Sequence, residues 1–325
     1  MGYKGFSPGL ICLGKRYTEN TVFEEGEAKI CRSGMHFCEN PIDVLDHYAV
    51  VNDDGTFNDF AEVESLAGTE TCDNKKFCTK KLKIGVKLNF SEFISACVDF
   101  VLKRTKLGTT SANHAHVVSY GDSAQIGNSG YCAKVASAGD YVQIGSSGAS
   151  AKIGNTGDYV QIGSAGFEAQ IGSSGYSAKI VSSGDYAQVA SAGDYVQLGS
   201  AGSFAKIGSS GIGVQIGSSG AEAQIGSSGR SAKVVSSGDS AKIASAGDYD
   251  RVGSSGEDCV ICCAGPHSVA KAKKGSWIAL AEWRYDESKG RCVPICVKTE
   301  RVDGEIIKED VFYKLVDGKF TEAQD

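Results

Sequence analysis

The nonapeptide Gly-Asp-Tyr-Val-Gln-Ile-Gly-Ser-Ser occupies residues 139–147, and sixteen copies of this unit fill the chain from Gly121 to Ala264. Glycine opens every copy, and the sixth place is Ile, Val or Leu in all sixteen. The fourth place is Ala or Val in fourteen copies, whereas the fifth is Gln, Lys or Arg in fifteen. This alternation predicts one short, half-buried strand per copy, and so short a period predicts a β-solenoid (β-helix). We expect the repeated glycine to serve the corner after each strand through its unusual backbone angles.

Two signals bear on the number of copies in one turn. Valine takes the fourth place only in odd-numbered copies, at Val142, Val160, Val196 and Val214, which fits 18 residues per turn and two facing sheets. Lysine recurs in every third copy, at Lys152, Lys179, Lys206 and Lys233, which fits a triangular coil of 27. We favour 18, which gives eight turns and a rod of roughly 38 Å at about 4.8 Å per turn.

The segments on either side of the repeats are predicted to form smaller domains. Residues 1–88 predict an α+β module with strands near 2–6, 21–23, 34–38, 60–66 and 81–88, and a helix that begins at Asn40-Pro41. Residues 89–111 predict a helix capped by Ser91 that covers the open first turn of a solenoid spanning 112–265. Residues 266–325 predict a small antiparallel β cap, with hairpin turns at 302–305 and 316–319.

Composition excludes several classes of protein. The chain holds 33 basic and 39 acidic residues, and the repeats alone hold 8 basic and 12 acidic ones, so the basic stripe typical of nucleic-acid binding is missing. No apolar run of about eighteen residues predicts a membrane span. The N-terminus lacks the pattern of a secretory signal, which favours the cytoplasm and reduced cysteines.

Metal and cofactor sites are not predicted. Calcium-binding nonapeptides carry a fixed aspartate in each unit, whereas Asp holds the second place in only some copies here. Cys31 and Cys38 flank His36, and Cys259 and Cys262 have zinc-like spacing, but the latter pair falls on repeat places that favour small core residues.

The outward places of the solenoid predict a partner-binding surface. Aspartate and tyrosine are adjacent in five copies, and tyrosine is a frequent interface anchor. The structural alternative, in which Tyr covers the sheets and Asp begins the corners, stays open. The predicted surface consists of Asp140, Tyr141, Asp158, Tyr159, Asp185, Tyr186, Asp194, Tyr195, Asp248 and Tyr249.

One N-terminal motif carries a family resemblance. The run Cys31-Arg32-Ser33-Gly34-Met35-His36-Phe37-Cys38-Glu39-Asn40-Pro41, followed by Asp43-Val44-Leu45 and Tyr48, resembles a module of unknown function at the N-terminus of phage and prophage proteins. The resemblance covers about residues 2–88 and implies an origin in a mobile element, with no activity attached.

A second resemblance concerns catalysis. Gly34-Met35-His36-Phe37, a helix ending in Tyr48 and the strand Phe60-Ala61-Glu62-Val63-Glu64 are similar to the order of elements in ADP-ribosyltransferases of the poly(ADP-ribose) polymerase type. That resemblance implies an NAD-contacting strand at Tyr3-Lys4-Gly5 and catalytic candidates at His36, Glu62 and Glu64. His36 replaces the family's stacking tyrosine, and no late strand carries a catalytic glutamate. The alternative is that His36 is a structural residue whose ring is hydrogen-bonded on a half-buried strand. Glu62 and Glu64 would then be a solvent-exposed pair of carboxylates.

The predicted function is therefore binding rather than catalysis. We expect a phage- or prophage-encoded protein that uses a rigid solenoid surface to engage a host macromolecule in the host cytoplasm, such as a defence protein. Mimicry of nucleic acid by acidic rows is a weaker version of this hypothesis. The alternatives are a fibre-like, oligomeric virion component and an ADP-ribosyltransferase-like enzyme carried on the solenoid.

Overall fold

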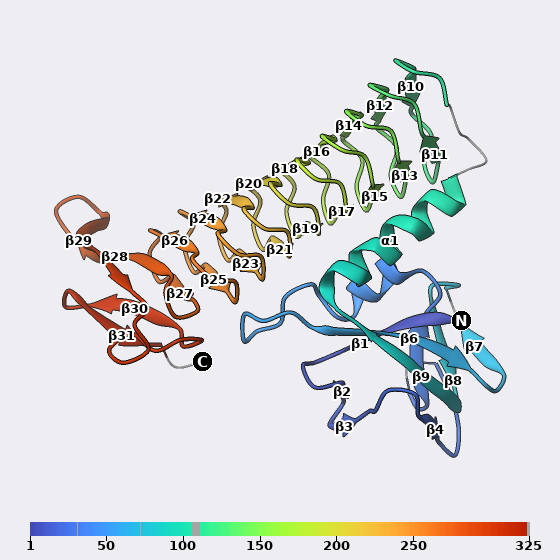
Figure 1. Cartoon of the computed structure of the whole chain (residues 1–325), viewed down its shortest axis with the longest axis horizontal. Helices are drawn as coiled ribbons and strands as arrows, with labels where there is room; N and C mark the ends of the chain where they lie inside the picture. Colours follow the sequence, from blue (N-terminus) through green and yellow to red (C-terminus); the bar gives the residue numbers. More distant parts are fainter. Residues whose placement is uncertain (31, 72, 106–110, 324–325) are drawn as a thin grey trace.

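The computed structural model describes residues 1–30, 32–71, 73–105 and 111–323. Figure 1 shows a coil of stacked turns with an N-terminal unit against its side and a C-terminal unit at one end. The helices of the described residues are α1 (Phe90–Arg104) and the short 3₁₀ helix η1 (Pro41–Asp46). The mainly β class and the solenoid are thus confirmed.

Two parallel sheets form the coil, and each turn adds one strand to each sheet. Strand pairing joins residues eighteen positions apart, such as Gln143 with Gln161 and Ile144 with Ile162. The 18-residue turn is confirmed, and the 27-residue triangular coil is wrong. Nine strands lie in each sheet before the C-terminal unit, so the coil has one turn more than predicted.

Even-numbered strands of the coil form one sheet and odd-numbered strands form the other, and we call these the even sheet and the odd sheet. The even sheet contains β10 (His116–Ser119), β12 (Lys134–Ser137), β14 (Lys152–Asn155), β16 (Gln170–Ser173), β18 (Gln188–Ser191), β20 (Lys206–Ser209), β22 (Gln224–Ser227), β24 (Lys242–Ser245) and β26 (Val260–Cys263). The odd sheet contains β11 (Gln125–Asn128), β13 (Gln143–Ser146), β15 (Gln161–Ser164), β17 (Lys179–Ser182), β19 (Gln197–Ser200), β21 (Gln215–Ser218), β23 (Lys233–Ser236), β25 (Arg251–Ser254) and β27 (Val269–Lys271).

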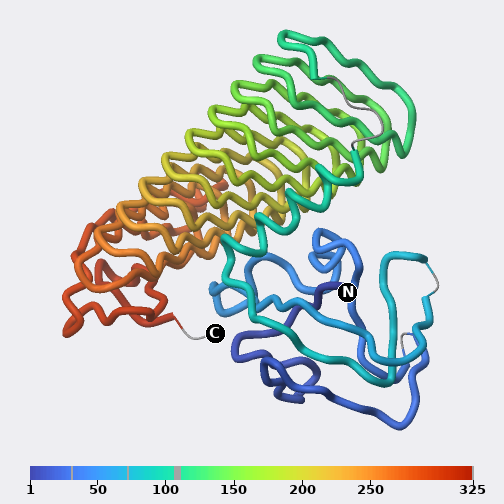
Figure 2. Tube along the Cα trace, turned by 45° about the vertical axis from the view of Figure 1, so that its right-hand side comes forward, coloured from blue at the N-terminus to red at the C-terminus, as the bar shows by residue number. Residues whose placement is uncertain are grey.

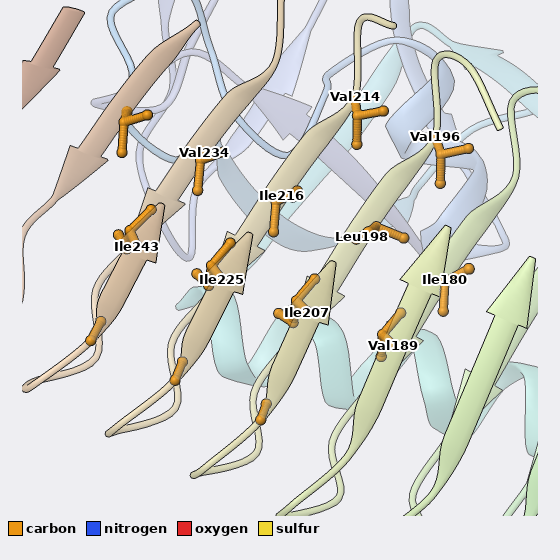
Figure 3. Packing of buried hydrophobic residues seen from close by; sticks show 14 of the residues in the cluster. Ile180, Val189, Val196, Leu198, Ile207, Val214, Ile216, Ile225, Val234 and Ile243 are labelled. Atoms are coloured by element: carbon orange, nitrogen blue, oxygen red, sulfur yellow. The ribbon is translucent and has the colours of Figure 1, made fainter. Parts of the chain in front are cut away.

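The core of the coil is one column of aliphatic side chains between the sheets. Figure 3 shows Ile207 and Ile225 of the even sheet beside Leu198 and Ile216 of the odd sheet in this space. Residues at the fourth and sixth places are almost fully buried along the coil. Because each unit is too short to bury these groups alone, stacking of the turns supplies the burial.

The corners differ from the prediction. The left-handed residue of each corner is the third-place residue, for example Tyr141 at φ 57° and Phe204 at φ 57°, while no first-place glycine has a positive φ. The repeated glycine instead permits close approach of successive turns, since a Cβ on Gly139 would lie 2.2 Å from the carbonyl oxygen of Gly121. The prediction that this glycine serves the corner through its backbone angles is therefore wrong.

The N-terminal unit is an antiparallel sheet in the order β4-β9-β6-β1-β5-β8-β7. Its strands are β1 (Gly2–Phe6), β4 (Val22–Glu24), β5 (Met35–Cys38), β6 (Asp59–Ser65), β7 (Thr69–Thr71), β8 (Lys76–Thr79) and β9 (Lys81–Leu88), and β2 (Ile11–Cys12) and β3 (Lys15–Arg16) form a separate hairpin. The bounds of β1, β4, β5, β6 and β9 lie within two residues of the five predicted strands, whereas β2, β3, β7 and β8 were not predicted.

Both helices begin at asparagine caps. The Asn40 side chain accepts the backbone N–H of Ile42, and Pro41 opens η1 as predicted. Asn89, not Ser91, caps α1, because its side chain and that of Glu92 form a reciprocal capping box.

The position of α1 also differs from the prediction. Figures 1 and 2 show α1 running along the side of the coil, between the odd sheet and the N-terminal sheet. The predicted cover over the first turn is wrong among the described residues, and residues 106–110 of the predicted cap lie outside them. The physical reason is the apolar face of α1, which fits a row of small residues on the outside of the odd sheet.

The C-terminal unit extends both sheets of the coil. β28 (Trp277–Asp286) joins the even sheet beside β26 and forms an antiparallel pair with β29 (Arg291–Arg301). β30 (Tyr313–Val316) and β31 (Lys319–Glu322) extend the odd sheet antiparallel to β27. The hairpin at 316–319 is confirmed, whereas 302–305 is a loop in which Asp303 accepts backbone N–H groups from three residues.

Candidate interaction surfaces

The outer face of the odd sheet is covered by the chain itself, and we call it the covered face. Its seventh-place residues form a row of small groups that meets the apolar stripe of α1. A Cβ on Gly163 would lie 3.3 Å from Val101, and one on Gly199 would lie 2.5 Å from Ile94. The glycines therefore let the helix approach the backbone of the sheet.

The fifth-place residues of the covered face bind the segment that contains η1. Gln161 accepts from the Asn40 amide at 3.1 Å and donates to Asp43 at 2.8 Å. Burial raises the pKa of Asp43, and the bond from Gln161 opposes that shift. Gln197 donates to the carbonyl oxygen of Leu45.

Two lysines add ion pairs to the same row. Lys179 pairs with Asp46 and Lys233 pairs with Asp53, both at 2.5 Å. The Lys179 side chain is 10% exposed and its partner Asp46 is about half exposed, whereas Asp53 is almost fully exposed. The covered face thus uses one row for helix packing and one row for polar recognition.

Sequence reasoning missed this contact, although the sequence carries a signal for it. The segments Ser-Ala-Lys-Ile-Val at 177–181 and Ser-Ala-Lys-Val-Val at 231–235 lie 54 residues apart. Their valines, Val181 and Val235, belong to the apolar cluster that α1 and η1 build with the odd sheet. Their lysines make the two ion pairs. Three 18-residue turns separate them, so the 54-residue recurrence marks where the N-terminal unit docks.

The outer face of the even sheet carries the same two rows but no covering element among the described residues, and we call it the open face. A Cβ on Gly154, Gly172, Gly208 or Gly226 would meet nothing within 4 Å. A groove of about 1070 Å³ runs along this face from His116 to Val260. The other seventh-place residues inside this groove are Val118 at its β10 end and three alanines, so its floor is apolar and, from β12 to β24, flat.

The rim of this groove is basic. From β12 to β24 its fifth-place residues are exposed, namely Lys134, Lys152, Gln170, Gln188, Lys206, Gln224 and Lys242, with His116 and Val260 at the two ends. Among the described residues, none of these four lysines takes part in an ion pair. A row of four lysines therefore lies on one face, which a charge count over all repeats does not reveal because it averages this face with the acidic corners.

The predicted Asp-Tyr surface divides between the two edges of the coil. Four pairs, beginning at Asp140, Asp158, Asp194 and Asp248, come from odd-numbered copies, and the pair Asp185-Tyr186 comes from an even-numbered copy. On the odd edge, Tyr141 and Tyr159 stack at 5.2 Å between ring centroids. On the even edge, Tyr186 stacks on Phe204 at 4.8 Å. The ten residues thus do not form one continuous surface.

The aspartates of these pairs also have structural partners. One carboxylate oxygen of Asp140 accepts the backbone N–H of Asp158, one turn further on, at 2.8 Å. Asp158, Asp185 and Asp194 make the equivalent bond to the next turn. Asp248 lies 2.8 Å from Nδ1 of His267. The tyrosine rings stay about half exposed, so contact with a partner through them remains a prediction.

A second candidate site is a pocket of about 390 Å³ in the N-terminal unit, lined in part by Lys4, Cys12, His36 and Tyr48. Lys4 donates to the carbonyl oxygen of His36 at 2.9 Å, and Tyr48 donates to the Cys12 sulfur at 3.0 Å. Burial lowers the pKa of Lys4, and burial together with neighbouring lysines lowers the pKa of His36. Both shifts favour the neutral form of the side chain.

The other two catalytic candidates lie elsewhere. Glu62 and Glu64 are on β6, where Glu62 pairs in register with Tyr3 and Glu64 with Lys83, and neither lines the pocket around His36. The structure does not bring the three residues together at one site. The resemblance to ADP-ribosyltransferases stays a prediction.

No cluster of three or more metal-ligating side chains occurs among the described residues. Cys259 and Cys263 are buried in the core of the coil, whereas Cys262 is exposed on its outside. Cys31 and Cys72 lie outside the described residues. Neither helix of the described chain has the length and hydropathy of a membrane-spanning segment.

Comparison with known proteins identifies the N-terminal unit only. Residues 1–96 match a family model described as a domain of unknown function, DUF7666. The match ends within α1 and includes no strand of the coil. A search of the curated proteins gives no match, and a search of the solved structures gives none either.

Proposed function

We propose that the protein is a non-enzymatic binding protein whose coil presents the open face to another macromolecule. One observation carries this proposal: the same two rows of residues are occupied on the covered face and exposed on the open face. On the covered face, the glycine row receives α1 and the Gln/Lys row receives polar groups of residues 40–53. The open face offers the same chemistry over a comparable length.

The N-terminal resemblance to phage and prophage modules supports the class of partner. We propose a host protein, with a defence protein as the specific hypothesis, met in the host cytoplasm. Mimicry of nucleic acid has less support, because the most continuous exposed face of the coil is basic.

Site-specific photocrosslinking in cells tests this proposal. A benzophenone amino acid replaces Ala190, which lies on the open face, and in a matched control it replaces Leu13, which is 99% exposed in the N-terminal unit. We expect a discrete protein adduct from position 190 that position 13 does not give. The proposal fails if both positions give the same adducts or if position 190 gives none.

End-to-end assembly is a second candidate function, supported by the first turn. β10 and β11 are the terminal strands of the two sheets, and their outer edges pair with no other strand of the described chain. Unpaired edges are templates for pairing with another chain. Light scattering distinguishes the cases: assembly through these edges predicts a dimer or larger oligomer, and a Val118→Lys substitution on β10 should shift it toward monomer.

A further inference from the structure

We propose that the open face binds an amphipathic α-helix of a partner protein, laid along the axis of the coil, with acidic side chains along one flank. This inference rests on the proposed function and names the occupant of the same surface. The covered face supplies the precedent, because α1 packs on its row of small residues while acidic and amide groups of residues 40–53 meet its Gln/Lys row.

The rise of an α-helix nearly matches the spacing between turns of the coil, and this explains why a helix fits along it. On the covered face, α1 runs from Leu102, over Gly145, to Phe90, over Gly217, which is four turns of the coil. Four turns at about 4.8 Å make about 19 Å, and the twelve residues from Phe90 to Leu102 rise about 18 Å. Each helical turn therefore meets about one strand. Any apolar stripe at positions i, i+3/i+4 and i+7 can follow a row of small residues on this coil.

The floor of the open face suits such a stripe. From β12 to β24 its seventh-place residues are Ala136, Gly154, Gly172, Ala190, Gly208, Gly226 and Ala244, and Val118 lies at the β10 end. Between β12 and β24 the row has no counterpart of Val181 or Val235, which leaves room for large side chains from the helix. Apolar side chains that enter this groove gain free energy by leaving water.

The basic rim sets the charge and spacing of the partner's acidic side chains. On the covered face, Lys179 and Lys233 meet aspartates of the N-terminal unit. On the open face, Lys152 and Lys206 are three turns apart and Lys206 and Lys242 two turns apart. These separations are about 14 Å and about 10 Å, and the positions on one flank of a helix that come nearest to them are about eleven and about seven residues apart.

A nucleic acid fits this face less well than an acidic helix. The cations form one row and alternate with glutamines, and the floor beside them is apolar. Glu168 lines the channel on the other side of this row, together with Lys152 and Lys206. A carboxylate at that position repels a phosphate backbone, whereas a helix can place its acidic side chains on the lysines and its apolar side chains on the floor.

Fluorescence anisotropy with the full-length protein tests the inference. The probe is a labelled twenty-residue helical peptide with Leu at i, i+3/i+4 and i+7 and Glu at the spacing derived above. Matched peptides carry Gln or Lys in place of Glu. We expect saturable binding of the Glu peptide, about tenfold weaker binding of the Gln peptide and no binding of the Lys peptide, since two or three ion pairs distinguish them.

Protein variants locate the binding. K152E/K206E should lose the Glu peptide and gain the Lys peptide, whereas K298E/K314E, with the same charge change in the C-terminal unit, should bind as the native protein does. Gly172→Leu/Gly208→Leu fills the floor of the groove, where neither residue has a positive φ and a Cβ meets nothing, so it should abolish binding without unfolding the coil. Equal binding by all four proteins overturns the inference.

The outcomes separate this inference from the proposed function. If position 190 crosslinks to a host protein through a segment that is not an acidic helix, the helix is wrong and the binding function stands. If neither the peptides nor a host protein engage the open face, both fail. Tighter binding of single-stranded DNA than of the Glu peptide at the same ionic strength also overturns the helix in favour of a polyanion.

Discussion

The repeated glycine gives the sharpest test of how the coil holds together. In Gly193→Ala, the added Cβ would lie 1.9 Å from the carbonyl oxygen of Gly175 and 2.7 Å from its carbon, both backbone atoms of the previous turn. In Gly208→Ala, the added Cβ meets nothing within 4 Å. Neither glycine has a positive φ, so the two substitutions are equal in backbone strain and differ only in the space available.

The expected loss in free energy of unfolding follows from the separation of the two turns that Gly193→Ala would force. A carbon that is 1.9 Å from an oxygen overlaps it by more than 1 Å, so the two turns must separate. Separation weakens neighbouring bonds between turns, such as that from Ala192 N to Ser173 O at 3.0 Å. Overpacking and the loss of about one hydrogen bond together should lower the free energy of unfolding by about 3 kcal/mol. Gly208→Ala should be neutral or should raise it by about 0.5 kcal/mol, because alanine restricts the unfolded chain.

Urea unfolding measures both variants. Far-UV circular dichroism follows the sheets, and fluorescence of Trp277 and Trp283 follows the C-terminal unit. We expect a large fall in the midpoint for Gly193→Ala and none for Gly208→Ala. Equal midpoints for the two variants would refute close approach of the turns as the reason for the nine-residue glycine period.

Three further predictions concern other contacts. Gly217→Val would place atoms 2.5 Å from Val50 and 2.8 Å from the Phe90 ring, so native-state trypsin digestion should release the N-terminal unit faster, whereas Gly226→Val on the open face should digest like the native protein. Lys179→Met removes the ion pair with Asp46 and should lower the urea midpoint by about 1 kcal/mol in free energy, an effect that high salt does not reproduce in the native protein. Burial raises the pKa of Asp250 above its ordinary 3.8, and a carboxyl shifted in this direction contributes stability at low pH that is lost as pH rises through its folded-state pKa. Asp250→Asn should therefore match the native protein below pH 3.8 and exceed it in stability at pH 7; a constant difference across this range would contradict the prediction.

The sequence predicts the coil well because each rule acts locally and repeats. Apolar residues at the fourth and sixth places, with a polar residue between them, predict the strands. Fourth-place valine occurs only in odd-numbered copies, and this distinguishes a coil of two sheets from one of three. The third-place conformation escaped prediction because Tyr, Ser, Glu and Phe all occupy that place and none favours a left-handed backbone as glycine does.

The docking of the N-terminal unit could not be predicted from local rules. The apolar face of α1 is equally compatible with covering the first turn and with lying along the side of the coil. The choice depends on contacts between residues more than a hundred positions apart, such as Asp43 with Gln161. For the predicted surface, the Asp-Tyr pairs drew attention to the corners, whereas the difference that matters for docking lies at the seventh place, where the odd sheet has Val181 and Val235.

That single place also explains why one face can stay open. A sheet face lined by Val181 and Val235 exposes branched apolar groups to water unless a partner covers them, and α1 does so within the chain. From β12 to β24 the open face is lined by glycine and alanine, which expose little apolar area per turn, and at about 25 cal/mol per Å² this costs the free protein little. The lysines beside it oppose pairing of two such faces through like-charge repulsion. The open face thus exposes little apolar area when it is alone, and this supports the proposal that it is kept for a second molecule, an acidic helix.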